Sequence, residues 1–158
     1  MPELTEVESV RRLLQPLKGA TILGVHSTDR RVLDARLDVT GQAVRAVDRR
    51  GKWLRLVLDR GYVFSHLGMT GDWTLLGPDA AALPFERVRV ELARGKKKLS
   101  ARYTDSRRFG HFITSETDID EWRELGPDPY LDGIDEARVL GFMKKRKRTP
   151  LDLTTLAG

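Results

Sequence analysis

Apolar and polar residues follow one period at the start of this chain and another period through most of the rest. Between residues 4 and 17 the apolar side chains recur at helical spacing, in an arc made by Leu4, Val7, Val10, Leu13, Leu14 and Leu17. Glu8, Arg12 and Gln15 fall on the opposite side, as they do in a helix that lies on a surface. The pattern therefore predicts one amphipathic helix, which ends near Lys18-Gly19.

About eight short apolar segments follow at intervals of roughly ten residues, with glycines and prolines between them. They cover residues 21–27, 44–48, 53–58, 62–65, 73–76, 88–92, 99–104 and 111–114. Residues 28–41 are typical of a loop or a short hairpin. Because no helical pattern separates the segments, they predict an antiparallel β-sandwich and not a parallel α/β sheet. Two short helices are expected near the end, at 119–124 and 136–146.

Composition narrows the class of protein. A chain of 158 residues with 40% hydrophobic and 32% charged residues is expected to fold as a domain with its own core. The absence of cysteine excludes disulfides and thiolate zinc sites from this chain. No signal peptide opens the sequence, and no apolar segment reaches the roughly 18 residues that a membrane span needs. We therefore expect a cytoplasmic protein.

The distribution of charge is more informative than the net charge of +5. Basic residues gather in four clusters, which are Arg49-Arg50-x-Lys52, Lys96-Lys97-Lys98, Arg107-Arg108 and residues 144–148. If these clusters share one surface, they form the electrostatic footprint of a protein that binds nucleic-acid phosphates. Alternatively, each is an ordinary solvated turn.

The first residues could carry covalent chemistry. Removal of Met1 leaves Pro2 as a terminal secondary amine, which when neutral is a nucleophile able to form a Schiff base. Glu3 and Glu6 follow closely enough to donate and accept protons beside it. The alternative is a plain helix start, with proline in the first turn and acids near the positive end of the helix dipole.

Helical geometry favours a special environment for Glu6, which falls inside the apolar arc between the directions of Leu13 and Leu17. A carboxylate that points at a core is costly unless a partner binds it, and the terminal amine lies about one helical turn away. We therefore expect Glu6 to be mostly buried and hydrogen-bonded. Glu8, on the polar side, is expected to be exposed and dispensable.

Two loop sequences stand out among the strands. His66-Leu67-Gly68-Met69-Thr70-Gly71 has two glycines in six residues, which fits an exposed loop that approaches a partner closely. Asp105-Ser106-Arg107-Arg108-Phe109-Gly110 offers two guanidinium groups beside an aromatic ring, a combination suited to phosphate contact and insertion between bases. The alternative places Met69 and Phe109 in the core, with Arg107 paired to Asp105.

Together with Pro2-Glu3-Leu4-x-Glu6-Val7-Glu8 at the start, these two loops resemble the formamidopyrimidine-DNA glycosylase family in order and spacing. The resemblance implies the family's N-terminal catalytic β-sandwich at residues 1–135, then the start of a helix-two-turn-helix region at 136–158. It also implies a base-excision repair enzyme of the bacterial nucleoid that removes oxidised purines, with lyase activity at abasic sites. Double-stranded damaged DNA is then the partner of a monomeric enzyme.

The resemblance also assigns roles to residues. Pro2 matches the nucleophile that attacks the sugar carbon C1′, Glu3 the acid that protonates the sugar ring oxygen, and Glu6 its supporting carboxylate. Lys52 matches a strand lysine that contacts DNA near the lesion, and His66 a residue at the DNA backbone. The residues that match those filling the gap left by the flipped base are Met69, Arg107 and Phe109, with Arg108 beside them.

The match has departures, and it leaves alternatives open. Thr5 and Ser106 stand where the family usually has proline, and Asp152 stands where it usually has lysine. The family's C-terminal zinc finger is absent, so no cofactor is expected in this chain. Weak, salt-sensitive DNA binding and weak activity are expected of a chain this short. The alternatives are a non-enzymatic DNA-binding module and a basic β-sandwich that binds RNA or a protein.

Overall fold

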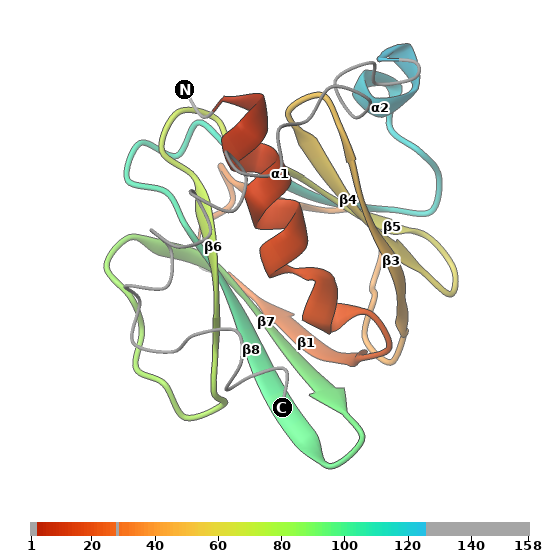
Figure 1. Ribbon diagram of the computed structural model, residues 1–158, viewed down its shortest axis with the longest axis vertical. Coiled ribbons are helices and arrows are strands. Elements are labelled where there is room, and N and C mark those ends of the chain that lie inside the picture. Colours follow the sequence, from red (N-terminus) through yellow and green to blue (C-terminus); the bar gives the residue numbers. More distant parts are fainter. Residues whose placement is uncertain (1–2, 28, 126–158) are drawn as a thin grey trace.

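The computed structural model describes residues 3–27 and 29–125, which form two β-sheets and a helix that lies against both (Figure 1). The four-stranded sheet has the order β1-β7-β8-β6, with bounds Thr21–His26, Glu86–Arg94, Lys97–Thr104 and Asp72–Leu76. The five-stranded sheet has the order β2-β9-β5-β4-β3, with bounds Leu33–Ala35, His111–Ser115, Tyr62–His66, Trp53–Leu58 and Val44–Arg50. The predicted mainly-β sandwich is confirmed.

Alternation along the strands builds the core between the sheets. In β4, Leu54, Leu56 and Leu58 are buried, while the residues between them are only half-buried on the outer face. A side-chain period of two sends alternate residues to opposite faces, so one apolar face per strand is enough to form the shared core. Inward-facing residues of both sheets join a single cluster with the residues of the N-terminal helix.

One strand within residues 28–41 departs from the prediction. β2 is only three residues long, and it pairs with β9 in parallel, with Leu33 opposite Phe112 and Ala35 opposite Thr114. All other strand pairs of the described residues are antiparallel. So short a strand has no alternation to detect, and its partner lies far away in the sequence.

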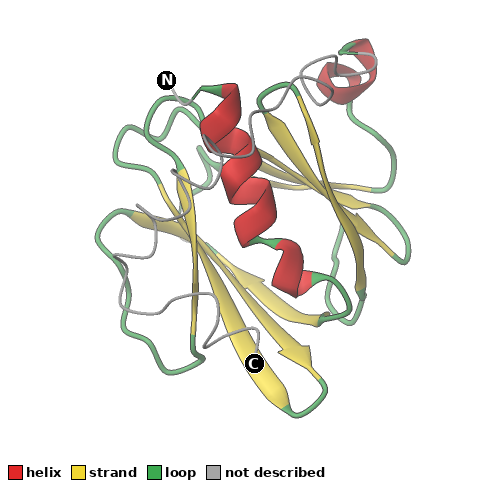
Figure 2. Ribbon diagram, viewed as in Figure 1, coloured by secondary structure: helices red, strands yellow, loops and turns green. Residues whose placement is uncertain are grey.

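The N-terminal helix α1 (Leu4–Leu13) crosses the opening between the sheets and contacts β3, β4 and β6 (Figure 2). It ends before residue 17 because Pro16 lacks an N–H group and its ring clashes with the preceding turn of an α-helix. The chain continues as a 3₁₀ turn at Gln15–Leu17. Val7, Val10, Leu13, Leu14 and Leu17 are buried, as the predicted apolar arc requires.

The expected exposure of Glu8 is wrong. Its residue is 1% exposed, and its carboxylate accepts hydrogen bonds from Arg11, Arg12 and Arg49. A helix that lies on one surface buries a single stripe, but α1 contacts both sheets and therefore also buries the side that carries Glu8. Burial on its own would raise the pKa of Glu8, but the three guanidinium groups hold that pKa below its ordinary value.

The predicted helix at 119–124 is confirmed as α2 (Asp120–Glu124). Ile119 and Trp122 pack with Phe64 and Ile113 in a second apolar cluster, which covers part of the outer face of the five-stranded sheet. The guanidinium groups of Arg50 and Arg55 lie over the Trp122 ring. The predicted helix at 136–146 and the predicted domain boundary after residue 135 lie outside the described residues.

Candidate functional site: two linked loops at one end of the sandwich

The two loop sequences meet at the same end of the molecule. Residues 67–71 connect β5 to β6, and residues 105–110 connect β8 to β9. Because β9 pairs with β5 and β8 pairs with β6, both connections cross between the sheets at the same ends of paired strands. The fold therefore brings together residues that are about 40 positions apart in the sequence.

A buried carboxylate links the two loops. Asp105 is fully buried, and one of its oxygens accepts the hydroxyl of Thr70 at 2.6 Å and the N–H of Arg108 at 3.0 Å. Its other oxygen accepts the hydroxyl of Tyr103 and the N–H of Gly110, both at 2.9 Å. Burial alone would raise the pKa of Asp105, but these four donors stabilise the anion and hold the pKa below its ordinary value.

Two glycines permit the close approach of the loops. A Cβ atom on Gly68, whose φ is +60°, would lie 2.6 Å from the carbonyl carbon of Phe109. A Cβ atom on Gly110 would lie 1.8 Å from the Tyr103 hydroxyl oxygen. Both distances are far below van der Waals contact, so a side chain at either position would force the loops apart.

The loops present three side chains to solvent, as the resemblance implies. Met69 is 45% exposed and Phe109 is 52% exposed, and the Arg107 guanidinium lies 3.7 Å from the Met69 sulfur. The Arg107 N–H donates to Thr70, and the four hydrogen bonds of the Asp105 carboxylate come from other groups. The alternative, with Met69 and Phe109 in the core and Arg107 paired to Asp105, is therefore wrong.

Arg108 has a different environment from Arg107. Its φ is +58°, which is costly for a residue with a Cβ atom, and its side chain is directed to the Asp29 carboxylate at 3.5 Å. Asp29 also lies 3.7 Å from the Arg87 guanidinium and accepts the N–H of Arg31. Arg108 therefore connects the 105–110 loop to the turn that follows β1.

His66 and Lys52 lie at the edge of the same region. His66 is half-buried, and its Nδ1 accepts the N–H of Gly68 at 3.0 Å. Burial lowers the pKa of His66, and the nearby charges of His111 and Lys52 lower it further. The imidazole is therefore neutral at pH 7, and Nε2 carries its proton and can act as a donor.

The structure describes two of the three catalytic residues expected at the helix start. Pro2 lies outside the described residues. Glu3 is exposed and precedes α1. Glu6 is half-buried in the first turn, less than expected, and Glu8 is buried where exposure was expected. The reason is the rotation of α1, which directs Glu8 toward β3 and the guanidinium of Arg49.

The Glu8–Arg49 pair also connects α1 to the turn that carries Lys52. The Arg49 side chain is fully buried, and its Nη1 donates a hydrogen bond to the carbonyl of Gly51 at 2.9 Å. Gly51 directly precedes Lys52. The sequence did not indicate this connection, because Arg49 lies next to Arg50 and Lys52 and such a run of bases is typical of a solvated cluster.

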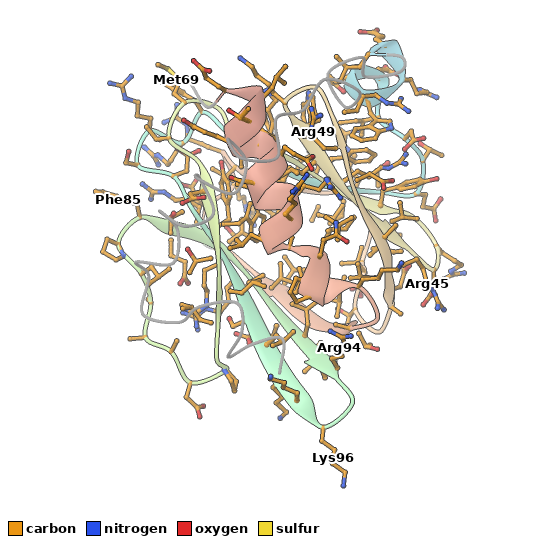
Figure 3. All side chains as sticks on the ribbon, viewed as in Figure 1. Arg45, Arg49, Met69, Phe85, Arg94 and Lys96 are labelled. Carbon is orange, nitrogen blue, oxygen red and sulfur yellow. The ribbon has the colours of Figure 1, made fainter. Side chains whose placement is uncertain are left out.

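The basic clusters do not form one surface. Arg49 lies beside α1 in the interior, and Lys96 lies at the tip of the β7–β8 hairpin, at the opposite end of the molecule from Met69 (Figure 3). Residues 144–148 lie outside the described residues. Of the positions described, Arg107, Arg108 and Lys52 are the members of the clusters that accompany the two linked loops.

The sequence matches the family described as formamidopyrimidine-DNA glycosylase N-terminal domain over residues 1–112. The chain belongs to the formamidopyrimidine-DNA glycosylase family. It is 38% identical to the formamidopyrimidine-DNA glycosylase of Pseudomonas paraeruginosa (strain DSM 24068 / PA7) over 156 residues, and 39% identical to that of Pseudomonas putida (strain W619) over 159 residues. These alignments cover 92% and 94% of this chain and 56% of each relative.

Solved structures agree with this family assignment. The wild-type Lactococcus lactis glycosylase in complex with DNA that contains N7-benzyl-Fapy-dG superposes with a TM-score of 0.66 and 31% identity. The same enzyme in complex with abasic-site DNA gives the same two values. Each superposition covers 74% of this chain and 45% of the solved chain. The chain thus spans about half the length of the family members that it matches.

Two further observations concern the described residues alone. They contain no group of three or more histidine or acidic side chains placed to hold a metal ion. Within the same ranges, no helix is both long and apolar enough to cross a membrane.

Proposed function

We propose that this chain takes part in base-excision repair, by removing oxidised purines such as formamidopyrimidine and 8-oxoguanine from duplex DNA and then cleaving the strand at the abasic site. The observation that carries the proposal is the exposed group of Met69, Arg107 and Phe109 on two loops that Asp105 holds together. Relatives at 38–39% identity bear the name of this activity.

The proposed chemistry begins at the terminal amine. Once Met1 has been removed, the Pro2 nitrogen attacks C1′ of the damaged nucleotide, and the bond from C1′ to the base breaks. Glu3 donates a proton to the sugar ring oxygen, the ring opens, and an iminium links Pro2 to C1′. Glu6 is the supporting carboxylate, in the same first turn, and can accept a proton from the amine. For the lyase step, Glu3, now a carboxylate, accepts a proton from C2′, and the 3′ phosphate leaves with the electron pair of the C3′–O bond, which breaks the strand.

The loops would stabilise the distorted duplex. Taking a base out of the helix costs a few kcal/mol in lost stacking, and inserted side chains offset part of that cost. Phe109 offers an exposed ring and Met69 an adaptable apolar chain, while Arg107 supplies a positive charge beside them. Lys52 and neutral His66 would contact the DNA backbone near the same position.

Borohydride trapping on abasic DNA tests the proposal. The reagent reduces the iminium and leaves a stable cross-link between protein and DNA, which denaturing electrophoresis resolves. Mass spectrometry first confirms that Met1 is absent. We expect the processed chain to form the adduct, and Pro2→Gly to reduce its yield at least tenfold. Lys96→Gln, at the far end of the sandwich, serves as a control with unchanged yield.

A chain that binds abasic DNA without forming any adduct would contradict the enzymatic proposal. It would support the other reading of the fold, a DNA-binding module without catalysis. The double variant Met69→Ala/Phe109→Ala distinguishes the two proposals. For an enzyme the pair of substitutions lowers the rate of trapping, whereas for a binding module it changes affinity alone.

A further inference from the structure

A second recess lies behind the linked loops, on the outer face of the five-stranded sheet. It is a groove of about 500 Å³ between the β2 edge of the sheet and α2. Its floor is formed by Trp53, His111 and Ile113, and its rim by residues 30–34 and Arg36 on one side and Glu121 on the other. Neither the proposed excision chemistry nor the loop insertion uses this groove.

The floor of the groove is aromatic because of strand register. Trp53 lies opposite His66 on β5, and His66 lies opposite His111 on β9, so the three side chains form one row across three strands. The Trp53 and His111 rings are nearly parallel, with 14° between their planes and 6.2 Å between their centroids. His111 is exposed and Trp53 is half-buried, and both line the groove, so part of each ring is accessible to a ligand.

Two of the three arginines on the rim are in no ion pair with the described acids. Arg36 is paired with Asp34 at 3.0 Å. Arg30 and Arg31 are exposed, and within the described ranges no ion pair engages either guanidinium. Glu121 stands on the α2 side, so an anionic ligand would approach along the side formed by residues 30 and 31.

The groove adjoins the candidate DNA surface. Asp29 accepts the N–H of Arg31 at 3.0 Å and lies 3.5 Å from the Arg108 guanidinium of the second loop. On the other side, His111 follows Phe109 by two residues. The second loop and the groove are therefore neighbours, so one DNA strand can contact both.

We propose that this groove binds an unpaired stretch of DNA, with a base stacked on Trp53 and His111 and adjacent phosphates held by Arg30 and Arg31. Flat aromatic surface next to cations is the combination that single-stranded nucleic acid requires, because unpaired bases expose their faces and duplex bases do not. An acidic peptide would use the two arginines but not the flat rings. The proposal is independent of base excision.

Binding of an undamaged oligonucleotide, dT10, to the 158-residue chain tests this site. Trp73 and Trp122 are buried and out of reach of the oligonucleotide. Quenching of tryptophan fluorescence on binding should therefore report a base that stacks on Trp53. Anisotropy of fluorescein-labelled dT10 gives the affinity of each variant. We expect Trp53→Leu to weaken binding about tenfold and Trp53→Phe to restore most of it, because stacking tolerates the exchange of one ring for another.

Charge variants provide the matched comparison. Arg30→Ser combined with Arg31→Ser should reduce the magnitude of the slope of log K against log salt by about 1.4, since each phosphate contact on a single strand contributes about 0.7. Lys96→Ser combined with Lys98→Ser removes the same charge from the exposed β7–β8 hairpin and should leave the slope unchanged. Circular dichroism and thermal melting confirm that each variant is folded.

Two results would overturn the inference. In the first, the groove variants bind dT10 as the parent does, while Phe109→Ala abolishes binding, which would place the strand on the loops alone. In the second, a poly-glutamate peptide binds as tightly as dT10 and competes with it, which would make the groove a site for acidic protein segments. Neither result bears on borohydride trapping, so the inference and the proposed repair activity can fail separately.

Discussion

At the scale of single residues, the candidate site depends on a side chain that never meets solvent. Asp105 accepts hydrogen bonds from three donors of the two loops and from Tyr103 of β8, and the exposed Met69, Arg107 and Phe109 owe their positions to it. A buried carboxylate costs free energy unless its oxygens are hydrogen-bonded, and here each oxygen accepts two donors. The exposed residues that would touch DNA are therefore positioned by the buried hydrogen bonds of Asp105.

We expect Asp105→Asn to lower the free energy of unfolding by about 2–3 kcal/mol at pH 7, because the amide carries no charge and its NH₂ group faces donors. Urea unfolding followed by circular dichroism measures the change. Exposed Asp79→Asn is the control and should shift stability by less than about 0.5 kcal/mol.

The pH dependence of this difference gives a second measure of the same variant. The pKa of Asp105 is lowered by folding, so its contribution is fully present above the unfolded pKa of about 4 and is lost as the pH falls through the lower folded pKa. The gap between parent and Asp105→Asn should therefore narrow below about pH 4. A gap that is absent at pH 7 would show that the carboxylate charge does not hold the loops.

Residue-level properties could be predicted from the sequence only where one pattern decided them. The sequence does not decide whether Phe109 is exposed or buried, because an apolar residue in a loop can point either to solvent or to the core, depending on the backbone. The unexpected burial of Glu8 shows the same limit, since helical spacing fixes relative directions on α1 but not the rotation of the helix against two sheets. The role of Asp105 needed the positions of Thr70 and Gly110, which tertiary structure alone supplies.

At the scale of elements, α1 buries Glu8 of its polar side as well as its apolar arc. Glu8 meets Arg49 of β3 across the helix–sheet interface, and Arg49 in turn donates to the carbonyl of Gly51. The helix start with Glu3 and the turn with Lys52 are thereby held to one another through buried charge. The strands were predictable because alternation is local, whereas this connection joins residues 41 positions apart.

We expect Glu8→Gln to lower the free energy of unfolding by about 3 kcal/mol, since it removes the buried negative charge that accepts a hydrogen bond from the Arg49 guanidinium. Glu6→Gln, two residues earlier and half-buried, should cost less than about 1 kcal/mol. Urea unfolding of both variants under one buffer condition gives the comparison. Equal stabilities for the two variants would mean that the interior pair does not fasten α1 to β3.

At the scale of the whole molecule, the number of basic residues overstates the surface available to DNA. The chain has 28 lysines and arginines against 23 acids, but many guanidinium groups are bound by carboxylates within the fold. Arg102 pairs with Glu86 in the interior, and Arg55 pairs with Asp48 and Asp118. Position within the fold, and not the sum of charge, decides which cations can reach a phosphate.

The salt dependence of duplex binding tests which cations these are. Each phosphate neutralised on duplex DNA contributes about 0.9 to the slope of log K against log salt. We expect Arg107→Gln to reduce the magnitude of that slope by about 0.9, because Arg107 is exposed beside Met69 on the proposed DNA-binding end. Lys96→Gln should leave the slope unchanged, because Lys96 lies at the opposite end (Figure 3).

Anisotropy titrations with one labelled duplex, undamaged or with a single abasic site, measure these slopes between low and physiological salt. The two duplexes should show the same difference between variants, since phosphate contacts do not depend on the base. A slope that falls equally for Arg107→Gln and Lys96→Gln would mean that the duplex contacts both ends of the sandwich. In that case the linked loops would not define the DNA-binding end, because a duplex bound across both ends must lie along the sheets.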